Sequence, residues 1–85
     1  MMSEAKVGEV THYFSRISVA VLDLSEPLRV GDSISIVGDI TDLQQAVTSM
    51  QVNYEDVEEG QPGQEVAVKV ASRVRPGDEV FRVEG

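Results

Sequence analysis

Few residues of this 85-residue chain could do chemistry. His12 is the one histidine, and the chain has no cysteine. Nucleophilic catalysis needs a serine or cysteine activated by a base, and no serine here has a His–Asp relay available to it. The sequence therefore predicts that the chain is not an enzyme. We interpret His12 as a structural histidine, hydrogen-bonded at one end of the fold, with a role in binding as the alternative.

An acidic run could in principle hold a hard cation. Glu55, Asp56, Glu58 and Glu59 follow one another closely. A calcium loop presents oxygen ligands in the order Asp-x-Asp-x-Asp-Gly, which this run lacks, so the pattern favours a solvated loop. One histidine and no cysteine also leave no ligand set for zinc. The sequence predicts no metal and no cofactor.

Three arginines could form a patch that binds an anion. Arg29 and Arg75 occupy equal places in two similar segments, and Arg73 precedes the second. If these segments pack side by side, three guanidinium groups could hold a carboxylate or a phosphate. The alternative is that the arginines pair with Asp32, Asp78 and other nearby acids.

Two adjacent aromatic residues beside a cation suggest a surface for a partner. Tyr13 and Phe14 precede Arg16, and strand alternation would point one of the two rings outward. Exposed aromatics next to an arginine are common in recognition surfaces. Tyr13, Phe14 and Arg16 are therefore the candidate partner surface.

The elements that would position these residues are strands joined by tight turns. The segments 28–32 and 74–78 each place a Gly-Asp pair before alternating apolar residues, which is how a chain reverses into a β-strand. Gly31 and Gly77 are predicted to adopt a positive φ, because turns of this kind need one.

Six segments show the alternation of strands and are separated by turn residues. They span residues 7–14, 17–22, 33–36, 43–54, 66–70 and 79–83, and residues 55–63 are expected to form a charged loop. In the first segment, Val10, His12 and Phe14 should share a face. In the second, both faces are apolar or small, which predicts a strand covered on two sides.

Residues 40–50 also fit a helix. Ile40, Leu43, Val47 and Met50 have helical spacing, whereas Met50, Val52 and Tyr54 alternate as in a strand. We favour a long strand over 43–54, with a bulge where the two periods meet.

These signals predict an all-β fold in one domain. In so small a chain, closing the sheet is the surest way to leave no unpaired edge strands that could aggregate. We therefore expect a single small closed six-stranded antiparallel β-barrel over residues 7–85. Residues 1–6 are expected to form a flexible segment.

The charge and the hydropathy pattern restrict partners and location. Fifteen acidic residues against seven basic ones give a net charge of −8, which repels nucleic acid and anionic membranes. The N-terminus lacks the pattern of a secretory signal, and no apolar run is long enough to span a membrane. The sequence predicts a cytoplasmic protein that does not act on membranes and does not bind nucleic acid on its own.

Several landmarks stand together in a recognisable order. They are Gly8-Glu9-Val10, residues 28–32, Val47-Thr48-Ser49-Met50, residues 58–66 and Arg75-Pro76-Gly77-Asp78. In this order they resemble the β-barrel that follows the GTPase domain in elongation factor Tu. The resemblance covers Val7 to Val83 and looks nearest to the stand-alone archaeal proteins called translation elongation factor-like. The barrel appended to collagenase-like peptidases is similar.

The resemblance implies a module that docks to a protein or ribonucleoprotein partner and has no catalytic activity. No Gly-x-x-x-x-Gly-Lys-Ser/Thr phosphate loop is present, so GTP should not bind. Val21 and Leu22 replace the Gly-Arg pair with which the factors face tRNA. Two alternatives remain: an accessory subunit that positions substrate for a collagenase-like peptidase, or a weak RNA-binding barrel.

Overall fold

The computed structural model describes residues 3–84, and in this range the chain forms ten β-strands and no helix. In chain order they are β1 (Ser3–Phe14), β2 (Val19–Leu24), β3 (Leu28–Arg29), β4 (Ser33–Val37), β5 (Asp42–Ala46), β6 (Met50–Val52), β7 (Glu55–Asp56), β8 (Glu59–Gly60), β9 (Glu65–Lys69) and β10 (Glu79–Glu84). The predicted all-β class is confirmed. The helical alternative for residues 40–50 is wrong, and no helix in the described range could cross a membrane.

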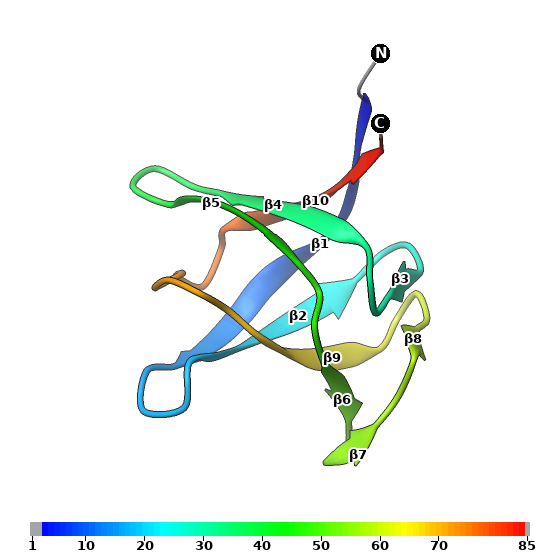
Figure 1. Cartoon of the computed structure of the whole chain (residues 1–85). Coiled ribbons are helices and arrows are strands. Elements are labelled where there is room, and N and C mark those ends of the chain that lie inside the picture. The colour runs from blue at the N-terminus through cyan, green and yellow to red at the C-terminus, as the bar shows by residue number, and fades with distance from the viewer. Residues whose placement is uncertain (1–2, 85) are drawn as a thin grey trace.

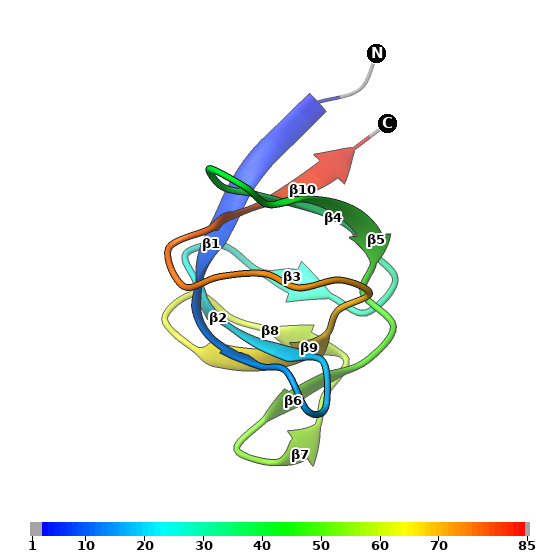
Figure 2. The ribbon, with the colours of Figure 1, turned by 90° about the vertical axis from the view of Figure 1, so that its left-hand side faces the viewer.

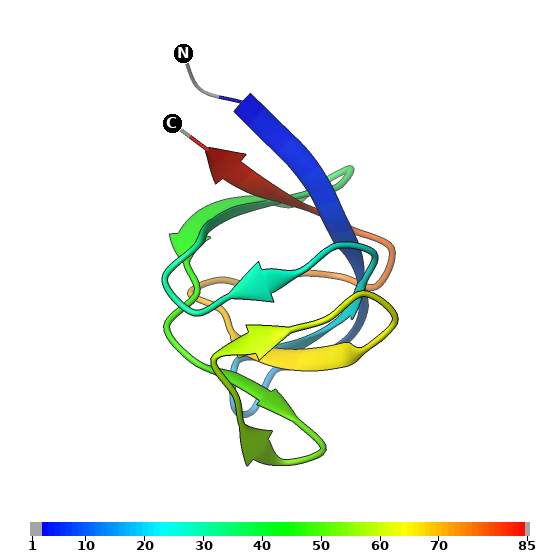
Figure 3. The ribbon, with the colours of Figure 1, turned by 90° about the vertical axis from the view of Figure 1, so that its right-hand side faces the viewer.

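Eight of the strands form one antiparallel sheet in the order β5-β4-β10-β1-β2-β9-β6-β7 (Figure 1). The sheet curls, so that β4 and β5 lie at one side of the interior and β6 and β9 at the other (Figure 2). β3 and β8 form a separate two-stranded sheet, which lies across the front of the view in Figure 3. The loop expected over residues 55–63 thus contains two short strands, β7 and β8.

The sheet does not close into a barrel, so this part of the prediction is wrong. The backbone ladder ends at β5 on one side and at β7 on the other. The cause lies at residues 47–49, where the strand expected over 43–54 is interrupted. β5 pairs with β4 as far as Ala46, and β6 pairs with β9 from Met50 onward. No single strand therefore pairs with both β4 and β9.

A side chain bridges part of the opening. The amide nitrogen of Gln45 donates to the carbonyl of Lys69 at 2.8 Å, and the N–H of Ala71 donates to the Gln45 amide oxygen at 2.7 Å. A primary amide offers the same donor and acceptor as a peptide group. Gln45 therefore links β5 to the end of β9 where no strand does.

Three turns of one design enter β4, β9 and β10. They span Arg29–Asp32, Gln61–Gln64 and Arg75–Asp78, and in each the third residue is a glycine with φ of +99°, +86° and +94° respectively. The last N–H donates to the first carbonyl at 3.0, 3.1 and 3.0 Å, as in type II turns. The last side chain accepts from the first N–H at 2.9, 2.8 and 2.8 Å. The positive φ predicted for Gly31 and Gly77 is confirmed.

Each turn is also fastened to a residue elsewhere in the fold by a reciprocal pair of backbone hydrogen bonds. The glycine N–H donates to the carbonyl of the distant residue. The N–H of the distant residue donates to the carbonyl of the last turn residue. The pairs are Gly31 with Val47, Gly63 with Leu24 and Gly77 with Val10, with glycine N···O distances of 2.8 Å throughout. The bonds back to Asp32, Gln64 and Asp78 measure 2.8, 3.0 and 2.8 Å.

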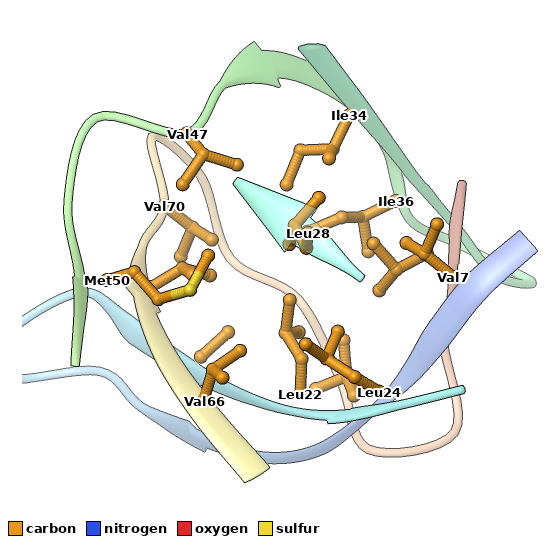
Figure 4. Packing of buried hydrophobic residues seen from close by; sticks show 14 of the residues in the cluster. Val7, Leu22, Leu24, Leu28, Ile34, Ile36, Val47, Met50, Val66 and Val70 are labelled. Carbon is orange, nitrogen blue, oxygen red and sulfur yellow. The ribbon is translucent and has the colours of Figure 1, made fainter. Parts of the chain in front are cut away.

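The core lies among these turns. The three residues that form hydrogen bonds with the turns are all buried: Val47, Leu24 and Val10. The second residue after each turn is also buried; these residues are Ile34, Val66 and Val80. Figure 4 shows core side chains from strands and loops converging on one interior. Each turn thus places an apolar side chain inward at the start of the following strand.

β1 begins four residues earlier than the sequence suggested. Residues 3–6 pair with β10, in register from Ser3 opposite Glu84 to Lys6 opposite Phe81. These residues therefore belong to the sheet and not to the flexible segment expected over 1–6, of which residues 1 and 2 lie outside the described range.

Alanine at Gly31, Gly63 or Gly77 should lower the free energy of unfolding by similar amounts, about 1–2 kcal/mol each. A Cβ at any of the three positions meets no atom within 4 Å, so the cost comes from the left-handed backbone alone. Urea unfolding of the three variants measures it. A loss at only one position would show that the turns are not equivalent.

Leucine at Gln45 should cost about 1–2 kcal/mol, the net value of two hydrogen bonds. Glutamate is the matched variant, because its ionised carboxylate can still accept from Ala71 but cannot donate to Lys69. Thermal unfolding should show both variants below the wild type. Unchanged stability in both would mean that the amide does not hold β5 to β9.

Candidate functional site

A bulge at Thr11 redirects the second half of β1. The register with β2 shifts between Val10 and His12. Val10 points into the core, but beyond the bulge Tyr13 packs inward while His12 and Phe14 are exposed. The prediction that Val10 shares a face with His12 and Phe14 is therefore wrong, because the bulge adds a residue and reverses the alternation.

A hollow of about 680 Å³ lies on the outer face of β1, β2, β9 and β6. We call it the outer groove. Val19, Val21 and Ala67 are half-buried and form its floor, whereas Phe14, Ile17 and Tyr54 are exposed at its sides. The hairpins β1–β2 and β6–β7, which carry the side residues, project from the side of the molecule opposite the start of β1 and the end of β10 in Figures 1, 2 and 3.

The floor of the groove includes one face of β2, a strand that the sequence predicts to be covered on both faces. β2 was expected to be covered on both faces because Val19 and Val21 alternate with Ala20 and Leu22. The structure buries Ala20 and Leu22 and leaves Val19 and Val21 half-buried. Ile17, expected within the strand, lies in the preceding turn and is 60% exposed.

Tyr54 is held in a strained conformation beside the groove. Asn53 and Tyr54 are the two loop residues of the β6–β7 hairpin, with φ of +51° and +66°. Two positive φ values mark a type I′ turn, which strongly prefers Asn-Gly. A bulky residue in this region is an outlier, and such strain clusters at functional sites. The side chain is 96% exposed, so core packing does not explain the tyrosine.

Sequence reasoning missed Tyr54 as a site residue. The alternation Met50, Val52, Tyr54 indicated a continuing strand, and the usual hairpin signal of glycine after Asn53 is absent.

His12 extends the aromatic side of the groove. Its ring stacks on Phe14, with centroids 6.2 Å apart and planes at 10°. Its Nδ1 lies 3.2 Å from the hydroxyl of Thr11. His12 is exposed, so its ring and that of Phe14 together present an aromatic surface.

The charges lining the groove are balanced. Glu65 and Lys69 stand at the two ends of β9. The hydroxyl of Thr11 donates to Glu65 at 3.3 Å. Arg16 is exposed in the β1–β2 turn and is not among the lining residues. Of the expected partner surface, only Phe14 lines the groove.

The structure does not gather the three arginines into one patch. β3, which carries Arg29, lies on the other side of the molecule from the orange segment that contains Arg73 and Arg75 (Figures 1 and 2). Arg29 lies 3.5 Å from the carboxylate of Glu59, and the guanidinium of Arg75 donates to Thr41 at 3.5 Å.

The turn aspartates are engaged with backbone. Asp32 and Asp78 accept from the N–H groups of Arg29 and Arg75, and not from their guanidinium groups.

The remaining charged groups pair along the strands. The ammonium of Lys6 lies 3.1 Å from both Glu79 and Glu9, and its hydrogen bonds to Glu79 and then to Glu9 raise the pKa of Lys6. In the acidic run, Asp56 accepts from Gln51 at 3.0 Å. Among residues 3–84 no three acidic, histidine or cysteine side chains meet as a metal site would require.

A second hollow, of about 620 Å³, lies at the β4–β5 hairpin. Val37 and Ile40 stand beside it, together with Arg75 and Pro76. Ile40 is 74% exposed at the tip of the hairpin. No aromatic side chain lines this hollow.

Comparison with known proteins connects this fold to peptidases. No family model matches the chain. An uncharacterised protease of Methanocaldococcus jannaschii is 39% identical over 77 residues, which are 89% of this chain and 19% of the protease. A collagenase of Porphyromonas gingivalis is 36% identical over 78 residues, which are 89% of this chain and 22% of the collagenase. The chain spans about a fifth of the length of the curated relatives it matches.

Solved structures show the same fold. The C-terminal domain of a Geobacillus thermoleovorans protein assigned to the U32 peptidases superposes with a TM-score of 0.86 at 20% identity, covering 94% of this chain and 92% of that domain. Its selenomethionine form gives 0.85, with 89% and 96% covered. The chain is therefore similar in fold to the C-terminal domain of a U32 peptidase and in sequence to part of collagenase-like proteins. The finer resemblance to the elongation-factor barrel stays a prediction.

Glycine at Tyr54 should raise the free energy of unfolding by about 0.5–1 kcal/mol, because Asn-Gly fits a type I′ turn without strain. Valine is the matched variant and should be destabilising, since a β-branched side chain is worst at positive φ. Urea unfolding compares the two. A less stable glycine variant would mean that the tyrosine side chain supports the fold.

Proposed function

We propose that this chain is a non-catalytic accessory domain that works with a peptidase of the collagenase-like class. Its role would be to hold a polypeptide substrate beside the catalytic part. Support comes from the relatives, in which the matching segment is about a fifth of a protease or a collagenase. The matching fold was solved as a C-terminal domain by itself, which is consistent with a separately folded module.

The observation that carries the proposal is the exposed outer groove. Apolar surface that is hollowed and flanked by exposed aromatics is typical of interaction sites. The groove has no histidine, serine and carboxylate arranged as a catalytic relay among its lining residues, which include Ser49 and Glu65. Its chemistry suits binding.

A ribonucleoprotein or RNA partner, as in translation factors, is less well supported. The net charge of −8 opposes phosphate contacts, and Arg29 lies apart from the segment that carries Arg73 and Arg75. The two aromatic sides of the groove could stack on bases, but the groove contributes a single cation, Lys69.

The test is proteolysis by the collagenase-like peptidase of the organism that makes this chain, measured with and without the chain. For gelatin, the chain should lower KM and leave kcat unchanged, because it would add binding away from the scissile bond. For a short peptide that cannot reach both sites, it should change neither.

Two results would contradict the proposal. One is hydrolysis of either substrate by the chain alone. The other is an absence of any effect on gelatin cleavage at chain concentrations well above those of the peptidase. Phe14→Ala, altered in the groove, should lose the effect on gelatin cleavage, and Ile40→Ala, altered outside the groove, should keep it. An effect that both variants keep is a nonspecific effect of added protein.

A further inference from the structure

The floor of the outer groove cannot accept an added strand. The floor residues Val19, Val21 and Ala67 each have a ladder partner in both neighbouring strands, whereas residues 12–14 of β1 pair with β2 alone. The backbone N–H and C=O groups of the floor residues are thus committed to neighbours in the ladder. A ligand that lies on the floor must therefore bind through side chains, because strand addition is excluded there.

The side chains that the groove presents fit one kind of extended ligand. Val19, Val21 and Ala67 form a shallow floor of small side chains. Phe14 at the end of β1 and Tyr54 in the β6–β7 hairpin flank this floor, because β1 and β6 are at opposite ends of the order β1-β2-β9-β6. A polyproline II helix makes no internal hydrogen bonds and keeps its backbone solvated, so it needs no ladder partner. Grooves flanked by aromatic side chains are a known way to bind such segments.

Charge narrows the ligand further. The lining holds one carboxylate and one ammonium, Glu65 and Lys69, at opposite ends of β9 and about 13 Å apart along the strand. A polyanion would be repelled by the overall charge of −8. A polycation would be attracted by that charge, but in the groove it would find a single carboxylate, Glu65, and would be repelled by Lys69. A segment without charge matches the groove best.

We propose that the outer groove binds an uncharged, proline-rich stretch of polypeptide in the polyproline II conformation. Proline rings would pack against Phe14 and Tyr54, and the hydroxyl of Tyr54 or the amide of Asn53 could donate to a ligand carbonyl. The strained Tyr54 is explained as the residue that recognition requires in a place where stability prefers glycine. The identification of this ligand as peptidase substrate rests on the proposed function, but the binding itself does not.

The experiment measures binding of the whole chain to synthetic peptides by fluorescence anisotropy. The probe is a labelled (Pro-Pro-Ala)₄ peptide, and the comparison is a Thr-Val alternating peptide of equal length. The proline peptide should bind, and the alternating peptide should bind at least about tenfold more weakly. Equal affinity for the two, or no binding of the proline peptide at millimolar concentration, would overturn the proposal.

Variants locate the binding. Tyr54→Gly should weaken binding of the proline peptide about tenfold or more, although its melting temperature is not lowered. Phe14→Ala should act in the same direction. Ile40→Ala, which removes an exposed aliphatic side chain outside the groove, is the matched control and should leave binding unchanged. If all three variants bind alike, the groove is not the site.

One rival occupant gives a distinct result. If a second copy of the chain covers the groove, sedimentation should show a dimer that Phe14→Ala dissociates, and the proline peptide should bind only where it displaces the partner copy. A dimer whose stability is unaffected by the proline peptide would overturn the proposal. Binding of the peptide without any effect on gelatin proteolysis would leave this inference standing and would count against the proposed function alone.

Discussion

The fold depends on one interaction used three times: a glycine turn fastened by reciprocal backbone hydrogen bonds to a buried residue of another segment. Each fastening joins parts of the chain that lie far apart in sequence, as Gly77 and Val10 do. The turn then directs the next strand into the sheet with an apolar side chain inward. The same device at Val47 stops β5 and turns the chain toward β6, so the interaction that organises the core is also the one that leaves the sheet open.

Local chemistry was enough to predict most of the longer strands and two of the turns. Period-2 alternation located β4, β9 and β10, and Gly-Asp pairs marked Gly31 and Gly77. The third turn was missed because Gln64 takes the place of aspartate, although a glutamine side chain accepts the same bond. The break after Ala46 could not be predicted, because it is caused by hydrogen bonds between Val47 and the distant turn at 29–32.

The candidate site was less predictable than the fold for a related reason. Of the residues expected to form a partner surface, Phe14 lines the groove, but Tyr13 faces the core because the bulge at Thr11 resets the alternation. Bulges depend on how two strands fit together, and one strand's sequence does not show them. The arginine patch required two turns of equal sequence to lie together. The turns at 29–32 and 75–78 are similar because each precedes a strand, β4 or β10. These two strands run antiparallel, so the two turns lie at opposite ends of the pair.

The outer groove and its strained tyrosine run against what stability alone would select. An open face of a small sheet is normally covered with polar side chains, yet Val19 and Val21 keep an apolar floor there. Asn-Gly would relax the β6–β7 turn, yet the chain has Asn53-Tyr54. Places where a sequence departs from its own local rules are expected to be functional sites. Both departures lie on the same groove, and they favour this face over the hollow beside Ile40 as the binding site that we propose.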